Sequence, residues 1–360
     1  MNRVMACLRT LATLGFFFVA LVCGKSLLKV GSGSVKSTGM NMMFRIEWGD
    51  GPGKFRYQES EMGFESDTFP RKYVRDRQGN FYFLEPGPPA RLSKFSSDGR
   101  LVNLLDLAKI FPALTPNDVI TPQELFLQLD GNIAALLRVY LNVEERKEIY
   151  LAYFNPAGTL KTIVQFPHFK LGSFHLDNAS FLDKDGHLWV LNDGGVCDVY
   201  GPTGELVQSF PPAGSFVDRD GRLYFGFNPL KLYGRGVEKA EQILYEGHSV
   251  PGEPEEIDGA NSTGFLYSWR HLDKIRQGEV TAIPRTLNFY RLIMRHGKFE
   301  YVGEATLPPS KYRHPNPRSD YVERTELYEN RLVFDDAGNV YFLGRSPKEC
   351  WIERVQLEIK

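Results

Sequence analysis

The chain has 360 residues and a formal net charge of -1, because 44 acidic residues balance 43 basic ones. The absence of a long basic run excludes a nucleic-acid partner, since such proteins carry a basic patch that follows the phosphates. Aromatic residues make up 13% of the chain and are accompanied by 34 glycines and 22 prolines, which favours many short strands joined by tight turns.

The N-terminal segment is typical of an export signal. Arginines precede an uncharged run at residues 10–24, which is shorter than the roughly 20 residues that a membrane-spanning helix needs. We expect residues 1–24 to be a signal peptide or an N-terminal anchor, with lipidation of Cys23 as a third interpretation. Residues 25–40, rich in serine and glycine, predict a flexible tether. The protein is then periplasmic, extracellular or attached to the cell envelope, and it contacts the membrane only through an uncleaved N-terminal segment.

One hairpin pattern recurs along the chain. Its clearest copy is F-L-D-K-D-G-H-L-W-V-L at residues 181–191, where two apolar runs flank a polar turn. Asp183 suits the first position of a type I turn and Gly186 the fourth, where the backbone φ is positive. We expect the Asp183 carboxylate to make only a local hydrogen bond. The pattern returns at residues 76–82, 218–224 and 335–341, which predicts a repeat fold.

The strands fall into six groups after an isolated strand at residues 42–48. The expected strands are 73–76, 80–84, 90–95 and 100–105; 125–129, 133–140, 148–154 and 160–166; the hairpin 181–191 with 196–200 and 205–210; 215–218, 222–227, 232–236 and 242–246; 264–269, 288–294 and 298–307, with an insertion at 271–286; and 331–335, 339–345 and 350–357. The last group has three strands of its own, so residues 42–48 supply its fourth. A ring closed by strands from both termini leaves no large open edge.

The hairpins D-R-Q-G-N-F-Y-F, D-K-D-G-H-L-W-V, D-R-D-G-R-L-Y-F and D-A-G-N-V-Y-F resemble the inner hairpins of NHL-repeat, TolB-like and related bacterial six-bladed β-propellers. The resemblance covers residues 41–360 and implies an all-β fold of four-stranded antiparallel blades, closed by the N-terminal strand in the last blade. It implies little about activity, since such propellers include scaffolds, sensors, binding modules and hydrolases.

No catalytic or cofactor motif accompanies the repeats. The D-K-D-G and D-R-D-G turns begin like calcium loops, but position twelve would be Gly194 or Pro229, where a carboxylate is required. The closest histidines, His168 and His175, have no cysteine or carboxylate at ligand spacing. We therefore predict no cofactor and no metal.

The expected fold gathers the loops that follow each second strand at one end of the central channel, and a mixed polar and aromatic rim there suits a binding surface. The candidate residues on this face are Glu85, Asn192, Asp193, Asn228, Arg270, Tyr312 and Arg313, the last two within a blade-connecting loop at residues 308–328 that also holds Arg318 and Tyr321. Two functions fit this mixed polar and aromatic set. The first is a non-enzymatic, monomeric propeller that binds a partner protein or glycan. The alternative is a metal-dependent hydrolase of the gluconolactonase type, for which Glu85, Asn192 and Asp193 are suitable residue types.

Buried aromatic and cysteine residues complete the prediction. Trp189 and Trp351 lie inside strands and are expected to pack between blades. Cys197 and Cys350 fall in the third strands of groups half a ring apart, too far for a disulfide, which needs Cα atoms within about 7 Å. We expect two free, buried thiols.

Overall fold

The computed structural model describes residues 35–56, 70, 72–143, 145–167, 180–192, 196–210, 216–217, 220–225, 230–234, 241–246, 259–260, 265–271, 275–277, 280–293, 298–313, 323–335, 337, 339–345 and 348–359. The one helical element in these ranges is the 3-10 turn Leu107–Ile110. No helix in the described ranges is long and apolar enough to cross a membrane. Residues 1–34, which hold the expected signal segment and the beginning of the expected tether, lie outside the described residues.

Three separate four-stranded antiparallel sheets follow one another along the chain. The first holds β2 (Lys72–Arg75), β3 (Phe81–Glu85), β4 (Arg91–Phe95) and β5 (Leu101–Asp106); the second holds β6 (Val119–Leu127), β7 (Ile133–Leu141), β8 (Arg146–Phe154) and β9 (Leu160–Gln165); the third holds β10 (Ser180–Leu182), β11 (Leu188–Asn192), β12 (Val196–Tyr200) and β13 (Leu206–Phe210). Neighbours in each sheet are also neighbours in the chain. The all-β class and the four-stranded antiparallel unit are therefore confirmed.

The first strand of the second sheet begins earlier than its sequence pattern indicates. β6 starts at Val119 and passes through Pro122, with a register shift between Pro122 and Glu124. β6 is the edge strand of its sheet, and an edge strand next to a register shift is where a sheet tolerates proline, which has no N–H to donate. Proline lowers strand propensity, so the pattern alone placed the start at Leu125.

The remaining strands form one sheet of 13 strands, where separate units were expected. They are β14 (Phe216–Val217), β15 (Arg222–Phe225), β16 (Leu230–Gly234), β17 (Glu241–Glu246), β18 (Gly259–Ala260), β19 (Phe265–His271), β20 (Ile275–Gln277), β21 (Val280–Ile293), β22 (Lys298–Arg313), β23 (Glu323–Phe334), β24 (Asn339–Arg345), β25 (Glu349–Ile359) and β1 (Val35–Glu47). Residues 298–300 of β22 pair in parallel with β17, and residues 311–313 pair with the start of β23. β22 is longer than expected, and the backbone groups at its two ends take partners from these neighbouring strands.

Two segments expected to be loops are strands. The insertion at residues 271–286 contains β20 and the beginning of β21, which pair from Gln277 opposite Val280 to Ile275 opposite Ala282. Tyr312 and Arg313, expected in a connecting loop, are the last residues of β22. The first segment forms a local hairpin, and residues 280–282 and 311–313 also pair with one another across about thirty positions of the chain, which provides the backbone partners that make both segments extended.

The N-terminal strand completes the last group, as predicted. β1 pairs antiparallel with β25, with Phe44 opposite Ile352 and Ile46 opposite Cys350. The strand begins at Val35, so the last residues of the expected tether also pair with the end of β25. Both described ends of the chain are thus held in one pair of strands.

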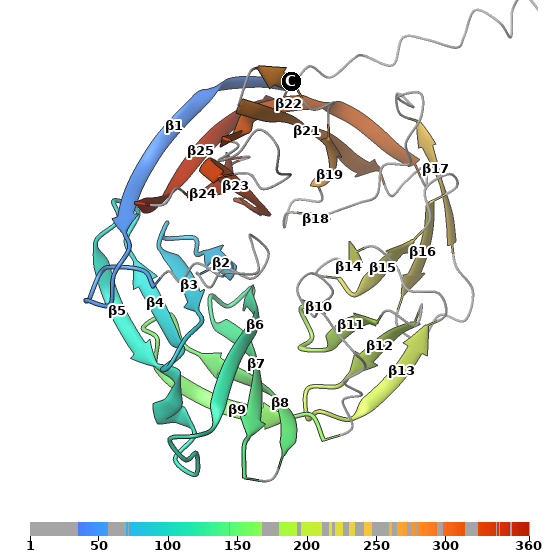
Figure 1. Cartoon of the computed structure of the whole chain (residues 1–360). Helices are drawn as coiled ribbons and strands as arrows, with labels where there is room; N and C mark the ends of the chain where they lie inside the picture. Colours follow the sequence, from blue (N-terminus) through green and yellow to red (C-terminus); the bar gives the residue numbers. More distant parts are fainter. Residues whose placement is uncertain are drawn as a thin grey trace, which may run out of the picture.

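Apolar side chains join the sheets in series. Phe44 and Ile46 of β1 share a core with Phe81 of the first sheet and Tyr341 of β24. Further cores join the first sheet to the second and the second to the third. Figure 1 shows the strand groups following one another around a common centre, with β1 and β25 beside the first sheet. Trp189 and Trp351, named above as packing residues, are 0% and 6% exposed.

The repeated aspartate makes more than a local hydrogen bond, so that expectation is wrong. The Asp183 carboxylate accepts a bond from the backbone N–H of His187 and a second, 3.0 Å long, from the indole N–H of the buried Trp189. The same arrangement links Asp76 to Asn80 and Tyr82, and Asp335 to Asn339 and Tyr341. The positive φ expected at the turn glycines is confirmed at Gly79, Gly186 and Gly221, while Asp218 and Gly338 lie outside the described residues.

Candidate functional site

The two ends of the strand groups differ. At one end, here called the turn end, described strands are joined by short turns of one kind at residues 76–80, 96–100, 128–132, 155–159, 183–187 and 201–205. At the opposite end, here called the loop end, the connections are unequal, and those between groups span residues 48–71, 107–118, 166–179, 211–215, 247–258 and 314–322. Uniform turns are typical of a scaffold, and unequal connections are typical of a functional surface.

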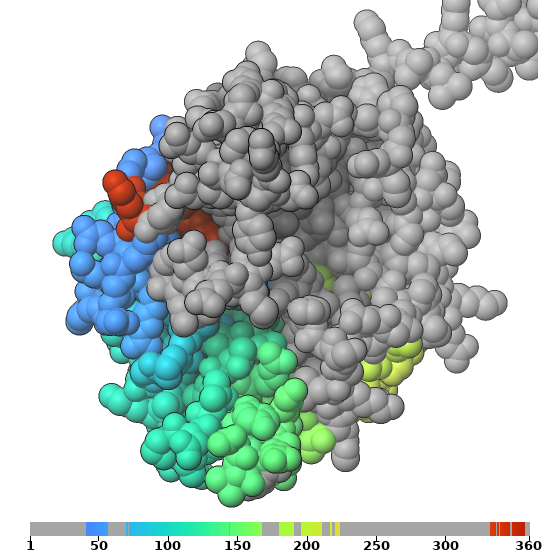
Figure 2. Space-filling view, viewed as in Figure 1, coloured from blue at the N-terminus to red at the C-terminus, as the bar shows by residue number. Residues whose placement is uncertain are grey.

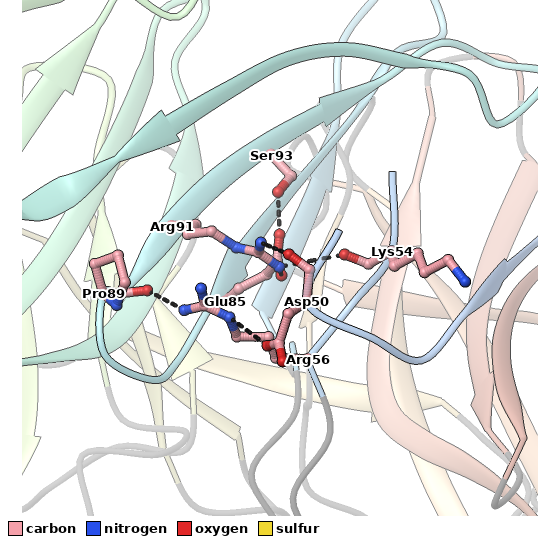
Figure 3. Close-up of polar contacts among 7 residues, drawn as sticks. All are labelled: Asp50, Lys54, Arg56, Glu85, Pro89, Arg91 and Ser93. Atoms are coloured by element: carbon pink, nitrogen blue, oxygen red, sulfur yellow. Dashed lines mark hydrogen bonds and ion pairs between the residues drawn. The ribbon is translucent and has the colours of Figure 1, made fainter. Parts of the chain in front are cut away.

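Glu85 lies at the loop end of the first sheet, but its side chain is 0% exposed. Its carboxylate accepts hydrogen bonds from the Ser93 hydroxyl and the Arg91 guanidinium, both on the neighbouring strand β4 (Figure 3). Burial raises the pKa of the Glu85 carboxyl, and the bonds from Ser93 and Arg91 oppose that rise. Glu85 is therefore the centre of an internal polar cluster and does not face a ligand.

The same cluster fixes the segment that follows β1. Arg91 donates to the backbone carbonyls of Asp50, at 3.4 Å, and Lys54, at 3.2 Å, and Arg56 donates to the Pro89 carbonyl at 2.6 Å (Figure 3). Phe55 is 0% exposed, with its ring 4.7 Å from that of Phe83. Figure 2 shows the described residues of β1 and this segment, in blue, lying beside those of the first sheets. The cluster joins the ring-closing strand to the first sheet.

A second buried ion pair lies at the same end of the inner strands. The Lys72 ammonium on β2 is 3.2 Å from the Glu124 carboxylate on β6, and their side chains are 11% and 4% exposed. The pair joins the first sheet to the second. The buried charged residues at the loop end of these two sheets thus form ion pairs with one another.

The residues named above as possible ligands of a divalent metal do not form a metal site among the described residues. Both Glu85 oxygens already accept protein hydrogen bonds, and the Arg91 cation beside them would repel a metal ion. Asn192 ends β11 in the third sheet, and Asp193 lies outside the described residues. Within the described ranges no group of three or more histidine, cysteine, aspartate and glutamate side chains could hold a metal ion.

Three other candidates belong to neighbouring strands of the 13-stranded sheet. Arg270 lies in β19 opposite Thr286 of β21, and Tyr312 and Arg313 lie in β22 opposite Thr281 and Val280 of β21. Figure 1 shows β19, β21 and β22 side by side. Asn228 lies outside the described residues.

We call the part of the 13-stranded sheet that lies at the loop end the loop-end extension. It comprises Arg270 and His271, β20, residues 280–286 of β21, residues 305–313 of β22 and residues 323–326 of β23. Its basic residues are Arg270, Arg276, Arg285, Lys311, Arg313 and Arg324, and its acidic residues are Glu323 and Glu326. The extension is basic in a chain whose net charge is -1.

Sequence reasoning missed Arg276, Arg285, Lys311 and Arg324. They come from four different strands and are separated by up to about fifty positions in the chain, so no local motif joins them. The available signal was the high share of arginine in and around the insertion at residues 271–286.

No protein-family model matches the chain, and no curated protein matches it. Among solved structures, the chain is similar to a protein of unknown function from Bacteroides caccae, with 14% identity, a TM-score of 0.41, and coverage of 67% of this chain and 87% of that one. It is also similar to the extracellular domain of a protein described as a hybrid two-component system from B. thetaiotaomicron, with 13% identity, a TM-score of 0.35, and coverage of 87% of this chain and 40% of that one. A third is the major Malassezia sympodialis allergen Mala s 1, with 11% identity, a TM-score of 0.36, and coverage of 79% and 92%. TM-scores this low carry no conclusion about the function of this chain.

Proposed function

We propose that the protein is an exported, non-enzymatic six-bladed β-propeller of the NHL-repeat or TolB-like type that binds a partner protein or glycan through its loop end. The observation that carries the proposal is the difference between the two ends: uniform turns at one, and long, unequal connections with the basic extension at the other. A ring of similar sheets holds such connections in fixed positions, as binding scaffolds do.

Repeated contacts between neighbouring groups support the ring. Asn103 of β5 donates to the Ala157 carbonyl in the outer turn of the second sheet. A Cβ on Gly204, in the outer turn of the third sheet, would lie 2.3 Å from the Gln165 carbonyl oxygen at the end of β9. A Cβ on Gly99, in the first sheet, would likewise lie 2.6 Å from Phe44 of β1. Each of these three outer turns thus contacts the outer strand of the preceding group, and the contact with Phe44 links the last group to the first.

The proposal is tested by attaching the exported chain to a surface through one end at a time. A cysteine replaces Ser97, at the turn end, or Val143, which is 79% exposed at the loop end between β7 and β8. Each form is probed with a glycan array and with the envelope proteins of the producing cells. We expect ligands to be retained by the form held at residue 97 and lost by the form held at residue 143. Equal retention by both forms, or none by either, contradicts the proposal.

A further inference from the structure

The second sheet extends further toward the loop end than the sheets on either side of it. β7 has nine residues after the turn at residues 128–132, whereas β3 and β11 have five residues each after the corresponding turns. Counted from these turns, Leu137 corresponds to Glu85 and Asn192, which end the two shorter strands. Residues 138–141 of β7, with their partners on β6 and β8, therefore continue for roughly 13 Å beyond the neighbouring second strands.

The face of this protruding part that points to the first sheet is covered, and its charges are paired. Phe111, in the connection from the first sheet to the second, lies with its ring 5.0 Å from that of Tyr150 on β8. The Glu148 carboxylate accepts a hydrogen bond from the Tyr150 hydroxyl and lies 2.7 Å from the Arg146 guanidinium. Val139, opposite Glu148 in the sheet, belongs to the core shared with the first sheet. This face therefore has a structural role.

The opposite face, which points to the third sheet, carries positive charge without a counter-charge. Ala134 and Leu136 of β7 belong to the core shared with the third sheet, and alternate residues of a strand share a face, so Arg138 and Tyr140 continue this face toward the loop end. Lys147 of β8 lies opposite Tyr140. Among the described residues, the side chains of Arg138, Tyr140 and Lys147 make no hydrogen bond, ion pair or ring contact.

Two residues of β6 complete this face. Val119 lies opposite Tyr140 and is 53% exposed, and the half-buried Thr121 lies opposite Arg138. The pairing is regular at these positions, and residues opposite one another in antiparallel strands share a face. β6, β7 and β8 lie side by side in Figure 1. The face thus combines two cations, one aromatic ring, one hydroxyl and one exposed apolar side chain.

The acidic residues nearest this face have other partners or positions. The Asp118 carboxylate accepts a 2.8 Å hydrogen bond from the backbone N–H of Asn142, which holds the turn between β7 and β8 to the beginning of β6. Glu148 lies on the covered face, and Glu145 lies in the turn, outside the paired rows. The two cations are therefore available to an anion from outside the protein.

We infer that the face formed by Val119, Thr121, Arg138, Tyr140 and Lys147 binds an acidic glycan, with a carboxylate or sulfate group at the two cations and a sugar ring against Tyr140. The inference rests on the proposed function and names the ligand class and its place at the loop end. Neighbouring strands lie about 4.8 Å apart and alternate residues of one strand about 7 Å apart. Lys147 and Arg138 therefore flank the tyrosine closely enough for the acidic group of a sugar on that ring to reach them.

Each residue type of this face suits that ligand. A guanidinium binds a carboxylate or sulfate through two parallel N–H bonds, which gives direction as well as charge. Arg138 is half-buried, so an anion beside it would compensate a charge that is already partly removed from water. A tyrosine ring offers an apolar face for the C–H groups of a sugar, and a threonine hydroxyl both donates to and accepts from sugar hydroxyls.

An extended acidic peptide fits this face less well. Such a peptide binds a sheet by adding a strand, which needs a free backbone edge. β7, which carries Arg138 and Tyr140, is paired on both sides, with β6 and with β8. The side chains of this face therefore offer the contacts, and the backbone of β7 does not.

The test is a binding measurement on the full-length chain with four probes: polygalacturonate, heparin fragments, neutral dextran and polyglutamate. We expect at least one of the two anionic polysaccharides to bind, with affinity falling as salt is raised, and the two together distinguish carboxylate from sulfate. The double variant Arg138→Gln with Lys147→Gln is expected to weaken this binding by about tenfold or more. Tyr140→Ala weakens it as well, and Tyr140→Phe, which keeps the ring, retains it.

The matched control removes the same charge outside this face. Lys109→Gln with Lys161→Gln replaces two exposed lysines, one in the 3-10 turn before the second sheet and one in its outer strand β9, and is expected to leave the affinity unchanged. Thermal melting verifies that each variant folds, and if the first double variant does not, Lys147→Gln alone takes its place. An equal loss in the control would mean that general attraction and not this face binds the polymer, which overturns the inference.

Other outcomes separate this inference from the proposed function. Equal binding of dextran removes the anionic specificity, and binding of polyglutamate that is lost in the double variant of Arg138 and Lys147 assigns the face to an acidic protein, so each overturns the inference. If none of the polysaccharides binds, the inference also fails, while ligand capture that depends on which end is held still upholds the loop end as the binding surface.

Discussion

The buried carboxylates of Asp76 and Asp183 and the partly buried carboxylate of Asp335 join the two strands of their hairpins through an aromatic side chain six positions later. Burial raises the pKa of the Tyr82 and Tyr341 hydroxyls, so these groups stay protonated and continue to donate. The second sheet lacks the arrangement, with Gln128 and Ala134 at the corresponding positions. The second sheet therefore serves as an internal control for the contribution of the aspartate to stability.

Asp183→Ala should lower the free energy of unfolding by about 2 to 4 kcal/mol. The substitution leaves the buried indole N–H of Trp189 without its acceptor, which by itself costs about 1 to 3 kcal/mol, and it also removes the bonds to the turn. Urea unfolding measures the loss. Gln128→Ala, at the corresponding position of the second sheet, is the control and should change stability by less than about 0.5 kcal/mol. Equal losses would contradict the role of the aspartate.

Gly186→Val should cost about 2 kcal/mol, because the φ of +82° at this turn position strains a β-branched residue. Gly51→Val is the control, since Gly51 has no positive φ and no atom within 4 Å of an added Cβ. The midpoints of thermal unfolding compare the two variants. A similar melting temperature for both would be inconsistent with the hairpin geometry.

Glu85→Ala should be strongly destabilising, by about 3 to 5 kcal/mol, because it leaves the Arg91 guanidinium buried without its counter-charge. Glu47→Ala breaks the exposed pair with Lys54 and should leave the urea midpoint unchanged. Loss of a ligand-binding activity from Glu85→Ala without any loss of stability would instead return Glu85 to the binding surface.

At the scale of elements, β1 joins the two ends of the chain. It is the first strand of the described residues, yet it pairs with β25 at the far end of the chain and contributes Phe44 and Ile46 to the core shared with the first sheet. An unpaired β25 would expose a long edge. The N-terminal strand therefore belongs to the folded unit and is not an accessory.

Phe44→Ala should cost about 3 kcal/mol or more, because the side chain is 7% exposed and its ring lies 5.3 Å from that of Phe81. Met42→Ala, two positions earlier at 41% exposure, is the matched control and should be nearly neutral. Deletion of residues 42–48 should cost more than Phe44→Ala. Removal of the chain before residue 40 takes away only the outermost pairs with β25 and should be milder. Thermal melting of the four variants in this order checks the assignment.

At the scale of the whole molecule, the two described cysteines belong to distant groups. Cys197 in β12 and Cys350 in β25 are both free and buried, as predicted. Burial, together with the nearby Asp198 carboxylate, raises the pKa of the Cys197 thiol, so the folded protein protects it from reagents that need the thiolate.

Thiol counting on the chain from residue 35 onward, which holds Cys197 and Cys350, should give no rapid reaction in the folded state and two reactive groups after unfolding without reductant. A disulfide between these residues would require their Cα atoms within about 7 Å, which the separation of the third and last groups prevents. Zero thiols in an unfolded monomer would contradict the order of the groups.

The sequence by itself determined the features that neighbouring residues encode. The turn glycines, the hairpins of the first three sheets and the strand at residues 42–48 depend on patterns a few residues long, and the unfilled edge of the last group identified the partner of that strand. The same local reasoning proposed Arg270, Tyr312 and Arg313 as candidates for the binding face, and that assignment stays a prediction.

Only the tertiary structure decided which of the remaining polar residues are internal and which lie together. Glu85 is of a residue type that often binds ligands, but its carboxylate accepts hydrogen bonds from Arg91 and Ser93 on the adjacent strand. Arg276 and Arg324 belong to one sheet because β20 pairs with β21, β21 with β22 and β22 with β23. Such relations arise from pairing between segments far apart in the chain, and a local pattern carries no information about the partner that a backbone edge will find.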